Sequence, residues 1–234
     1  MKVFIVHAHP EPRSFNAALT QEAVKVLTAE GHEVVVSDLY AQEWNPVSDR
    51  RNFTTVANPE YLKLQDEERH ASANHSFAPD VQAELDKALS CDALIFQFPM
   101  FWFSMPAILK GWVDRTFAAG ETYGRGRWFD NGVFKGKRAM LSITTGGPES
   151  LFTEDGLNGD IHQLLYPINH GTFRFVGFDV LRPFVAWSAA AAGDEGRAKY
   201  LEEYGQRLRT LWTETPVSYP SLSEFDPSTF RRRS

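Results

Sequence analysis

Five short runs of apolar residues that favour β-strands recur along the chain, and they set the strongest limit on its fold. They cover residues 3–6, 33–39, 93–98, 139–144 and 183–187, and the second contains three consecutive valines. Several of these runs are continuously apolar, whereas a strand with one solvated face alternates apolar and polar residues. We therefore expect strands that are buried on both faces, as in a parallel sheet with helices above and below.

Helical patterns lie between these runs. In the first, Ser14 is placed to cap the helix, an apolar stripe recurs at helical spacing, and Gly31 is placed to end it. The remaining patterns cover residues 80–89, 106–117, 160–177 and 194–212, with a weaker one near 61–70. Five strands and five helices fit the flavodoxin-like strand order 2-1-3-4-5, a doubly wound five-stranded parallel sheet with helices on both faces. A barrel of alternating strands and helices would need eight such units.

The chain is expected to form one α/β domain over residues 1–215, followed by a peripheral tail at 216–234. A length of 234 residues is enough for one well-buried domain with an appendage. Residues 41–78 are polar and rich in turn formers, so we expect them to wrap around the periphery.

Charge, cysteine content and hydropathy exclude several classes of protein. With 24 basic and 30 acidic residues the net charge is −6, which argues against nucleic acid as a partner because phosphate binding needs a clustered basic face. The single cysteine, Cys91, excludes an internal disulfide framework, and we interpret it as a core residue at a helix–strand junction. No apolar stretch approaches the roughly 20 residues that span a bilayer. The start, MKVFIVHAH, has no signal-peptide pattern, so we expect a cytoplasmic protein.

In an open α/β sheet, ligands bind at the carboxyl ends of the strands, near the point where the strand order reverses. Three segments follow the expected first, third and fourth strands at that edge. They are HAHPEPRSFN at 7–16, PMFWFSMP at 99–106 and TTGGPESLF at 144–152. These segments are the places to look for a binding site.

The first segment delivers Ser14, Phe15 and Asn16 to a helix N-terminus, where free N–H groups and the helix dipole favour a phosphate. His9 and Arg13 would add charge there. A proline-stiffened turn with a capping serine would explain the same residues. No GxGxxG motif is present, so a Rossmann dinucleotide fingerprint is absent.

The third segment pairs Thr144 and Thr145 with Gly146 and Gly147. Glycines let backbone N–H groups approach a ligand closely and can form an anion-binding nest. A tight turn alone would use the same residues, so this motif is weak by itself.

The second segment carries three consecutive aromatic residues, Phe101, Trp102 and Phe103, after Pro99 and Met100. Rings at the carboxyl end of a strand cannot all be buried beneath the sheet, whereas flat rings suit the stacking of a planar heteroaromatic cofactor. The alternative is that the rings only cover the end of the sheet. Since three separate loops offer phosphate, ring and amide contacts at one edge, we favour a bound flavin.

At these residues the chain resembles the NAD(P)H:quinone oxidoreductase family, the DT-diaphorase-type branch of flavodoxin-like proteins. The resemblance runs from about residue 3 to residue 215. The matching stretches are AHPEPRSFN (8–16), SDLYAQEWNP (37–46), QFPMFWFSMPAILKGWVDR (97–115), LSITTGG (141–147), GD followed by LLYPINHG (159–171), and GF and VL within 177–181. Taken together, these stretches are highly specific.

The resemblance implies a homodimer with two sites at the subunit interface, each holding FAD, rather than FMN, without a covalent bond. It implies two-electron reduction of a quinone by NAD(P)H, with a hydride passed to the flavin and then to the quinone by a ping-pong mechanism. We assign the catalytic role to the residues expected beside the reacting ring, which are Trp102, Phe103, Gly146 and Gly147.

Carried over residue by residue, the resemblance predicts three groups of binding residues. The phosphates and adenosine of FAD would lie near His9, Ser14, Phe15, Asn16 and Arg197. The isoalloxazine ring would be lined by Pro99, Met100, Phe101, Trp102, Phe103, Thr144, Thr145, Gly146 and Gly147. The substrate pocket would be formed by Tyr123, Arg125, Phe152, Asn158 and Phe175, of which Phe175 matches an aromatic residue contributed by the partner subunit.

Some positions depart from the family pattern. The second of two tyrosines that cap the substrate pocket is replaced by Arg125, and the tyrosine–histidine pair credited with relaying charge and protons to the flavin is Phe152 and Asn158 here. The hydrogen-bond donors that remain are the backbone N–H groups of residues 145–147. His170 matches one ligand of a metal site in a relative, but a missing cysteine leaves no ligand set, so we predict no metal.

Two other functions are alternatives. A flavin-bearing regulatory subunit that docks on a membrane transporter would need a docking surface that one sequence does not reveal. A one-electron flavodoxin carrier is disfavoured, since such carriers are more acidic and need no aromatic slot for two alternating substrates. The sequence identifies neither the quinone nor the preference between NADH and NADPH.

Overall fold

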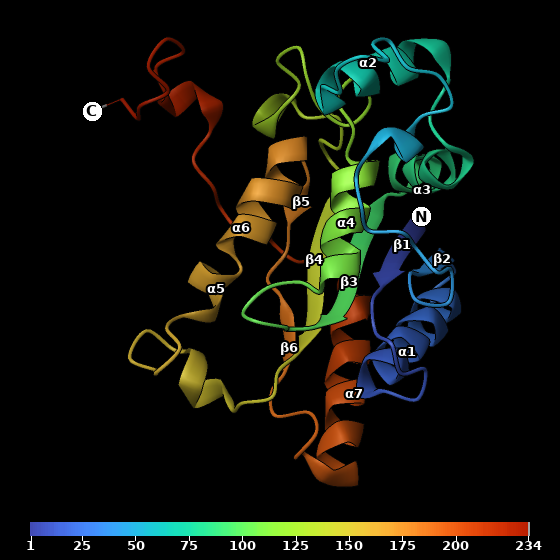
Figure 1. Cartoon of the computed structure of the whole chain (residues 1–234). Coiled ribbons are helices and arrows are strands. Elements are labelled where there is room, and N and C mark those ends of the chain that lie inside the picture. Colours follow the sequence, from blue (N-terminus) through green and yellow to red (C-terminus); the bar gives the residue numbers. More distant parts are fainter. Residues whose placement is uncertain (234) are drawn as a thin grey trace.

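The computed structural model describes residues 1–233 and has a central parallel sheet between two layers of helices (Figure 1). The strands of the sheet are β1 (Lys2–His7), β2 (Glu33–Asp38), β3 (Ala93–Pro99), β4 (Arg138–Thr144), β5 (Asp179–Val180) and β6 (Phe184–Ala186). Their order is β2-β1-β3-β4-β5, and β6 also pairs with β4, so the predicted flavodoxin-like order is confirmed. The fifth strand expected at 183–187 corresponds to β6, and the structure adds the short strand β5, which was not predicted; Pro183, which has no N–H to donate, lies between the two strands that pair with β4.

The helices cover both faces of the sheet (Figure 1). They are α1 (Phe15–Ala29), α2 (Leu64–Asn74), α3 (Pro79–Ser90), α4 (Ala107–Thr116), α5 (Ile161–Leu164), α6 (Tyr166–Ile168) and α7 (Gly193–Arg209). As predicted, Ser14 caps α1, and its Oγ accepts the N–H of Ala17 at 3.1 Å. One core cluster joins α1 and α7 to the sheet, and a second joins α3, α4 and residues 161–178 to the other face.

The prediction of one continuous helix over residues 160–177 is wrong. The segment contains α5, α6 and a π-helical turn, η4 (Asn169–Arg174). Pro167 interrupts the α-helical hydrogen bonds because it lacks an N–H. The π-turn leaves Phe173 buried in the core and Phe175 half-buried near the surface, and single π-turns often mark functional sites.

Residues 41–78 are packed more deeply than the expected peripheral wrap. They contain the short helix η1 (Arg50–Asn52) and α2, which lies a few residues later than the weak pattern predicted. Arg115 of α4 holds the segment, since its Nε donates to Asn52 Oδ1 at 2.7 Å and its guanidinium carbon lies 4.4 Å from the centre of the Trp44 ring. Trp44, Asn52 and Arg115 are all buried.

The chain leaves α7 and ends in a tail that leads away from the sheet (Figure 1). Within it, Ser221 caps the short helix η5 (Leu222–Glu224), and the Ser221 hydroxyl donates to Asp130 at 3.1 Å. The free thiol of Cys91 is buried between α3 and β3, as expected. Within residues 1–233, no helix combines the length and apolar character that crossing a bilayer would require.

Candidate functional site

The three predicted loops begin at one edge of the sheet because β1, β3 and β4 are neighbours. The side chain of Asn16 connects them. Its Nδ2 donates to Thr144 Oγ1 at 2.9 Å, and its Oδ1 accepts a hydrogen bond from Gln97 Nε2 at 2.9 Å. Asn16 and Gln97 are both buried, so this polar link fixes the start of α1 against β3 and β4.

A cleft of about 500 Å³ lies beside the start of α1. Six of the predicted cofactor residues line it, together with Arg13, which was expected to add charge there. The six are His9, Ser14, Phe15, Asn16, Thr144 and Arg197, and sequence reasoning left out only Ala18, Ala189 and Ala190 among the lining residues. Ala189 and Ala190 follow β6, and the run of alanines at 189–192 was the only signal for them.

The walls of this cleft offer hydrogen-bond donors and positive charge. Within residues 1–233, no acceptor is bonded to the N–H groups of Phe15 and Asn16, the first two residues of α1. His9 Nδ1 lies 3.0 Å from the N–H of Glu11 and 3.2 Å from its carbonyl oxygen, which holds the imidazole ring in place. Among the described residues, Arg13 and Arg197 form ion pairs only with exposed carboxylates on their own segments, Glu11 and Asp194. The cleft therefore suits a phosphate group.

The aromatic segment forms a tight turn that projects Trp102 into solvent. Phe101 and Ser104 exchange two backbone hydrogen bonds, so Trp102 and Phe103 are the central residues. Both have positive φ angles, 49° and 62°, as in a type I′ turn, where Asn-Gly is usual. The left-handed conformation costs a residue with a side chain about 1–2 kcal/mol. Trp102 is 95% exposed, so the alternative that these rings only cover the sheet does not hold for it.

The loop after β4 has two unpaired N–H groups rather than the three that were expected. The N–H of Thr145 donates to the carbonyl of Ala186, at the end of β6, at 3.1 Å, so it is not free for a ligand. In the described part of the chain, nothing accepts from the N–H groups of Gly146 and Gly147. The Gly147 carbonyl accepts from Thr145 Oγ1 at 2.8 Å and from the N–H of Ser188 at 3.0 Å, which holds the loop.

Phe152 lies beside this loop. It is buried and packs against Trp187, with ring centres 5.3 Å apart. A Cβ added at Gly147 would come within 3.4 Å of the Phe152 ring. The N–H of Asn158 donates to the carbonyl of Leu151 at 2.9 Å, which brings residue 158 back to residue 152. Residues 152 and 158, where the resemblance leads us to expect a tyrosine and a histidine, are therefore neighbours.

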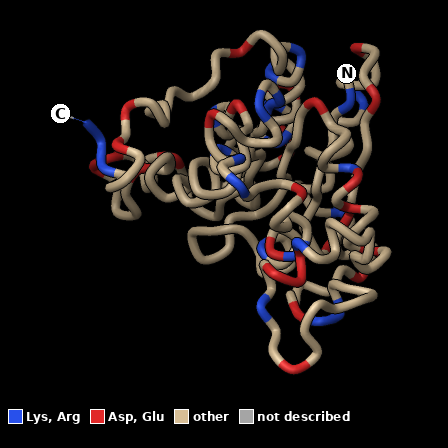
Figure 2. Tube along the Cα trace, turned by 90° about the horizontal axis from the view of Figure 1, so that it is seen from above, with Lys and Arg blue, Asp and Glu red and all other residues tan. Residues whose placement is uncertain are grey.

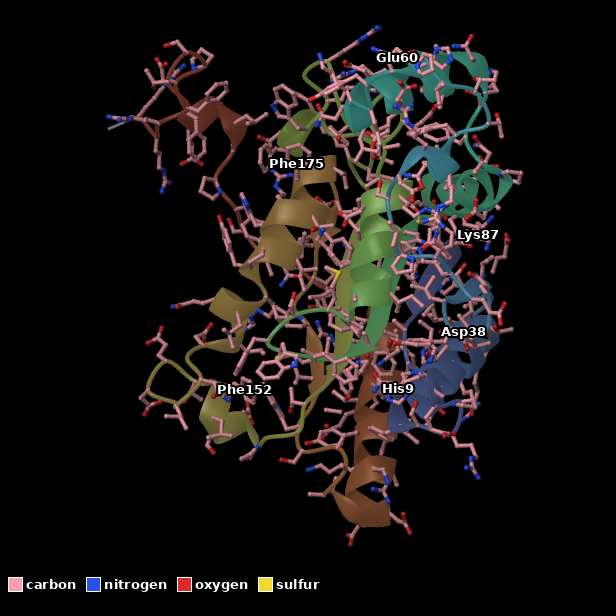
Figure 3. The ribbon with its side chains drawn as sticks, viewed as in Figure 1. His9, Asp38, Glu60, Lys87, Phe152 and Phe175 are labelled. Atoms are coloured by element: carbon pink, nitrogen blue, oxygen red, sulfur yellow. The ribbon has the colours of Figure 1, made fainter. Side chains whose placement is uncertain are left out.

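Tyr123 and Phe175 lie at the other end of the sheet. Figure 3 shows Phe175 at the upper end, and His9 and Phe152 at the lower end, toward which the strands run. The Tyr123 and Phe175 rings are 5.6 Å apart, and both line a second cavity of about 280 Å³. Arg125 is exposed two residues after Tyr123. Within one chain, the sheet thus separates Tyr123, Arg125 and Phe175 from the predicted flavin residues.

A buried carboxyl group, Glu68, lies beside Tyr123 and lines the same cavity. Its Oε2 accepts the N–H of Ala119 at 2.7 Å, and burial raises the pKa of Glu68. Burial, together with the Glu68 carboxylate, raises the pKa of Tyr123, whose hydroxyl accepts a hydrogen bond from Gln65 at 3.3 Å. Sequence reasoning missed Glu68, because nothing in QDEERH distinguishes the buried Glu67 and Glu68 from the exposed Asp66.

Charges of both signs are interspersed along the trace (Figure 2). Among residues 1–233, no group of three or more His, Cys, Asp or Glu side chains is arranged to hold a metal ion.

The candidate site consists of the aromatic turn, the loop after β4 and the cleft beside α1, with the Tyr123 cavity at the far end of the sheet.

Comparison with known proteins gives a consistent result. The model of a family with the flavodoxin-like fold matches residues 1–208. Ribosyldihydronicotinamide dehydrogenase (quinone) of Homo sapiens is 42% identical over 217 residues, which cover 92% of this chain and 94% of the relative. NAD(P)H dehydrogenase (quinone) 1 of Rattus norvegicus is 40% identical over 226 residues, which cover 96% of this chain and 82% of the relative. A solved protein from Klebsiella pneumoniae, provisionally described as a quinone reductase, is 38% identical with a TM-score of 0.96, over 100% of this chain and 94% of that protein.

Proposed function

The chain belongs to the flavodoxin-like fold family, among its quinone-reducing dehydrogenases, and from that premise we propose that it reduces quinones with NAD(P)H as donor and FAD as bound carrier. When bound, a flavin supplies a two-electron carrier that a reduced nicotinamide can reduce and a quinone can reoxidise. We also propose that the protein acts in the cytoplasm, where this donor is regenerated. The residues of this chain supply binding, orientation and hydrogen-bond donors.

The strained aromatic turn is the observation that carries this proposal. Trp102 and Phe103 hold left-handed backbone angles, and nothing within their own chain buries the Trp102 ring. Strain of this kind persists at ligand-binding sites, where the rigid geometry is useful. A flat ring system stacked against the turn would gain roughly 0.5–1.5 kcal/mol beyond the burial of its area. The turn would then position a nicotinamide or a quinone at contact distance.

The loop after β4 fits the polar edge of such a ring. The N–H groups of Gly146 and Gly147 have no partner within residues 1–233, and neither can lose its proton near neutral pH. Preorganised donors of this type stabilise negative charge that develops during a reaction. This role would remain with the backbone because Phe152 has no hydroxyl group.

The cleft beside α1 supports FAD over FMN. FMN ends at one phosphate, which the free N–H groups at the start of α1 could hold alone. The cleft continues from Ser14 to Arg197 and the alanines at 189–190, and its volume is about 500 Å³. A second phosphate and an adenosine group would explain this extension.

The separation of Tyr123 and Phe175 from the aromatic turn supports a homodimer. In such a dimer, the turn of one copy would face the Tyr123 cavity of the other, and each of two sites would use both chains. The apolar exposure at the turn fits this arrangement, since Phe101 and Phe103 are each nearly half exposed beside Trp102. A single chain would leave the substrate side of the flavin open to water.

A mixed dimer tests the shared site. One chain carries Trp102→Ala and the other carries Tyr123→Ala, with different affinity tags so that the mixed dimer can be purified. One of its two sites would then have both residues intact and the other would have neither, so we expect about half of the wild-type activity, well above either homodimer. If each site lies within one chain, the mixed dimer will be no more active than the average of the two variants.

Steady-state kinetics test the activity itself. With NAD(P)H and a simple benzoquinone, we expect parallel double-reciprocal lines, because donor and quinone use the same slot in turn. Converging lines, or a quinone product reduced by only one electron, would contradict the proposal. Ribosyldihydronicotinamide belongs in the donor series, because the relatives carry both donor names.

A further inference from the structure

Three arginines surround a small cavity outside the site described above. Arg69 and Ser72 reach it from α2. Arg125 and Arg127 reach it from the segment 119–127 that follows α4, which we call the hairpin. The cavity has a volume of about 160 Å³. We call Arg69, Arg125 and Arg127 the arginine cluster.

The arginine cluster has more positive charge than its neighbours neutralise. Arg69 pairs with Asp66 at 2.8 Å. The Arg127 guanidinium donates to the carbonyl oxygen of Gly120, which leaves its full charge in place. Within residues 1–233, no carboxylate oxygen lies within 4.0 Å of the guanidinium nitrogens of Arg125 or Arg127. Of the carboxylates nearby, Glu68 is turned to the neighbouring cavity and accepts from Ala119.

Arg125 is held at the tip of a tight turn. The N–H of Arg127 donates to the carbonyl of Gly124 at 3.0 Å, and Arg125 and Gly126 between them have φ angles of 52° and 82°. A residue with a side chain is uncommon at such an angle. This is the backbone arrangement that also presents Trp102, so the hairpin fixes an exposed arginine in the way the aromatic turn fixes an exposed ring.

The arginine cavity adjoins the Tyr123 cavity. Glu68 and Tyr123 line one, and the residues next to them in the chain, Arg69 and Gly124, line the other. In the dimer proposed above, a donor stacked at the aromatic turn of one copy would enter the Tyr123 cavity of the second copy. The arginine cluster would lie at the border of that cavity.

We propose that the arginine cluster binds an oxyanion of the substrate, namely a phosphate of a dinucleotide donor, and so selects NADH and NADPH over ribosyldihydronicotinamide. This inference rests on the proposed function. NADH and NADPH carry phosphate groups beyond the reduced nicotinamide ring, and ribosyldihydronicotinamide carries none. Arginine forms charge-assisted, often bidentate, hydrogen bonds with phosphate.

The test compares three donors on the purified, flavin-loaded protein, with an uncharged benzoquinone as acceptor. The value of kcat/KM is measured for NADPH, NADH and ribosyldihydronicotinamide in wild type, Arg125→Gln and Arg125→Lys. Because both substitutions experience the same backbone angle, their difference reports the charge. In Arg125→Gln, kcat/KM should fall about tenfold or more with NADH and NADPH, and less than about twofold with ribosyldihydronicotinamide. Arg125→Lys should keep most of the activity with all three donors.

A binding measurement and a control variant complete the test. Calorimetric titration with ADP-ribose, which has the phosphates without the nicotinamide ring, should show binding to wild type that weakens about tenfold in Arg125→Gln. Arg51→Gln removes an exposed arginine whose partner is Asp49 and should change neither measurement.

Two results would overturn the inference, and a third would refute the proposed function on which it rests. Equal losses for all three donors in Arg125→Gln would show that the residue acts without reading phosphate. The assay is repeated with a sulfonated quinone as acceptor, and an activity loss in Arg125→Gln that appears only with this acceptor would assign the oxyanion to the quinone. Wild-type protein that reduces no quinone with any donor would refute the proposed function itself, whereas ADP-ribose binding would still report on the arginine cluster.

Discussion

The N–H of Phe101 donates to the carbonyl of Ser104, and the N–H of Ser104 donates to the carbonyl of Phe101, each at 3.0 Å. This reciprocal pair closes the turn that carries Trp102 and Phe103. Because backbone bonds hold the turn, the rings have their positions before any ligand arrives, and binding loses less conformational entropy. The turn is therefore a preorganised stacking surface.

Substitution of Trp102 separates its role in binding from its role in the fold. Trp102→Gly removes an exposed ring and relieves a left-handed backbone angle, so the free energy of unfolding of flavin-free protein should stay within about 1 kcal/mol of wild type or rise. Trp102→Ala keeps the strained angle and serves as the matched variant. Both should release flavin more readily in equilibrium dialysis. Full flavin retention combined with a large loss of thermal stability would mean that the tryptophan serves the fold.

The two glycines after β4 form a second matched pair. A Cβ at Gly146 would meet no atom within 4 Å among the described residues, whereas a Cβ at Gly147 would lie 2.7 Å from Leu151 Cδ1. Gly146→Ala should thus keep its unfolding free energy within about 0.5 kcal/mol, yet weaken flavin binding because its methyl group would occupy the space of the ring edge. Gly147→Ala should lose about 1 kcal/mol of stability as Leu151 moves. A Gly146→Ala protein with unchanged flavin affinity would place the ring elsewhere.

Flavin reduction should proceed without a histidine-type inflection between about pH 6 and 7. Phe152 and Asn158 cannot exchange a proton in that range, and burial lowers the pKa of His7 below its ordinary value of 6.5. Restoring the family pair in Phe152→Tyr/Asn158→His should accelerate reduction by up to about 100-fold and introduce an inflection. Stopped-flow reduction across pH measures both effects. An inflection in wild type would reveal another proton donor, and a double variant no faster than wild type would show that the relay does not limit the rate.

Stability should depend on pH through Glu68. Burial raises its pKa above the ordinary 4.5, so the folded protein keeps this proton at pH values where the unfolded chain has released it. The contribution of Glu68 is complete below pH 4.5 and is lost as the pH rises through the folded-state pKa. Glu68→Gln keeps an acceptor for the N–H of Ala119 but carries no charge. Its free energy of unfolding relative to wild type should therefore rise with pH, by about 1.4 kcal/mol per pH unit between the unfolded-state and folded-state pKa of Glu68.

Glu67 is the control for this measurement. Its carboxylate accepts the N–H groups of Ala57 and Asn58, and the bond from Ala57 is the main cause of its lowered pKa. Its contribution is present above the ordinary pKa of 4.5 and is lost as the pH falls through the lowered folded-state pKa. In urea unfolding at several pH values, Glu67→Gln should be less stable than wild type at neutral pH. The same pH trend in both variants would contradict the assignment to Glu68.

Local patterns predicted most strands and the three loops, because apolar runs and caps such as Ser14 depend on near neighbours in the chain, and the strand order then followed from the number of units and the handedness of crossovers. The additional strand β5 was missed because Asp179–Val180 is too short to form a recognisable run. The break in the helix at 160–177 was missed because the apolar pattern continues past Pro167.

The finer features of the site depend on distant parts of the chain. The aromatic segment was recognised, but neither Trp102 nor Phe103 signals a positive φ angle. Glu68 and Tyr123 are 55 positions apart in the chain, and only the packing of α2 against the hairpin shows that they meet. The Thr145 N–H donates to the carbonyl of Ala186 because β6 lies beside this loop, and no local sequence pattern could predict that position.

Hydride transfer is best tested by observing its two halves separately. Flavin-loaded protein is mixed without oxygen with one equivalent of NAD(P)H in a stopped-flow instrument, and a quinone is added afterwards. We predict that the donor alone bleaches the visible absorption of the flavin, and that the quinone restores it in one phase with one hydroquinone formed per flavin. Absorption that stays unchanged until the quinone is present, or that returns in two one-electron phases, would contradict a two-electron quinone reductase.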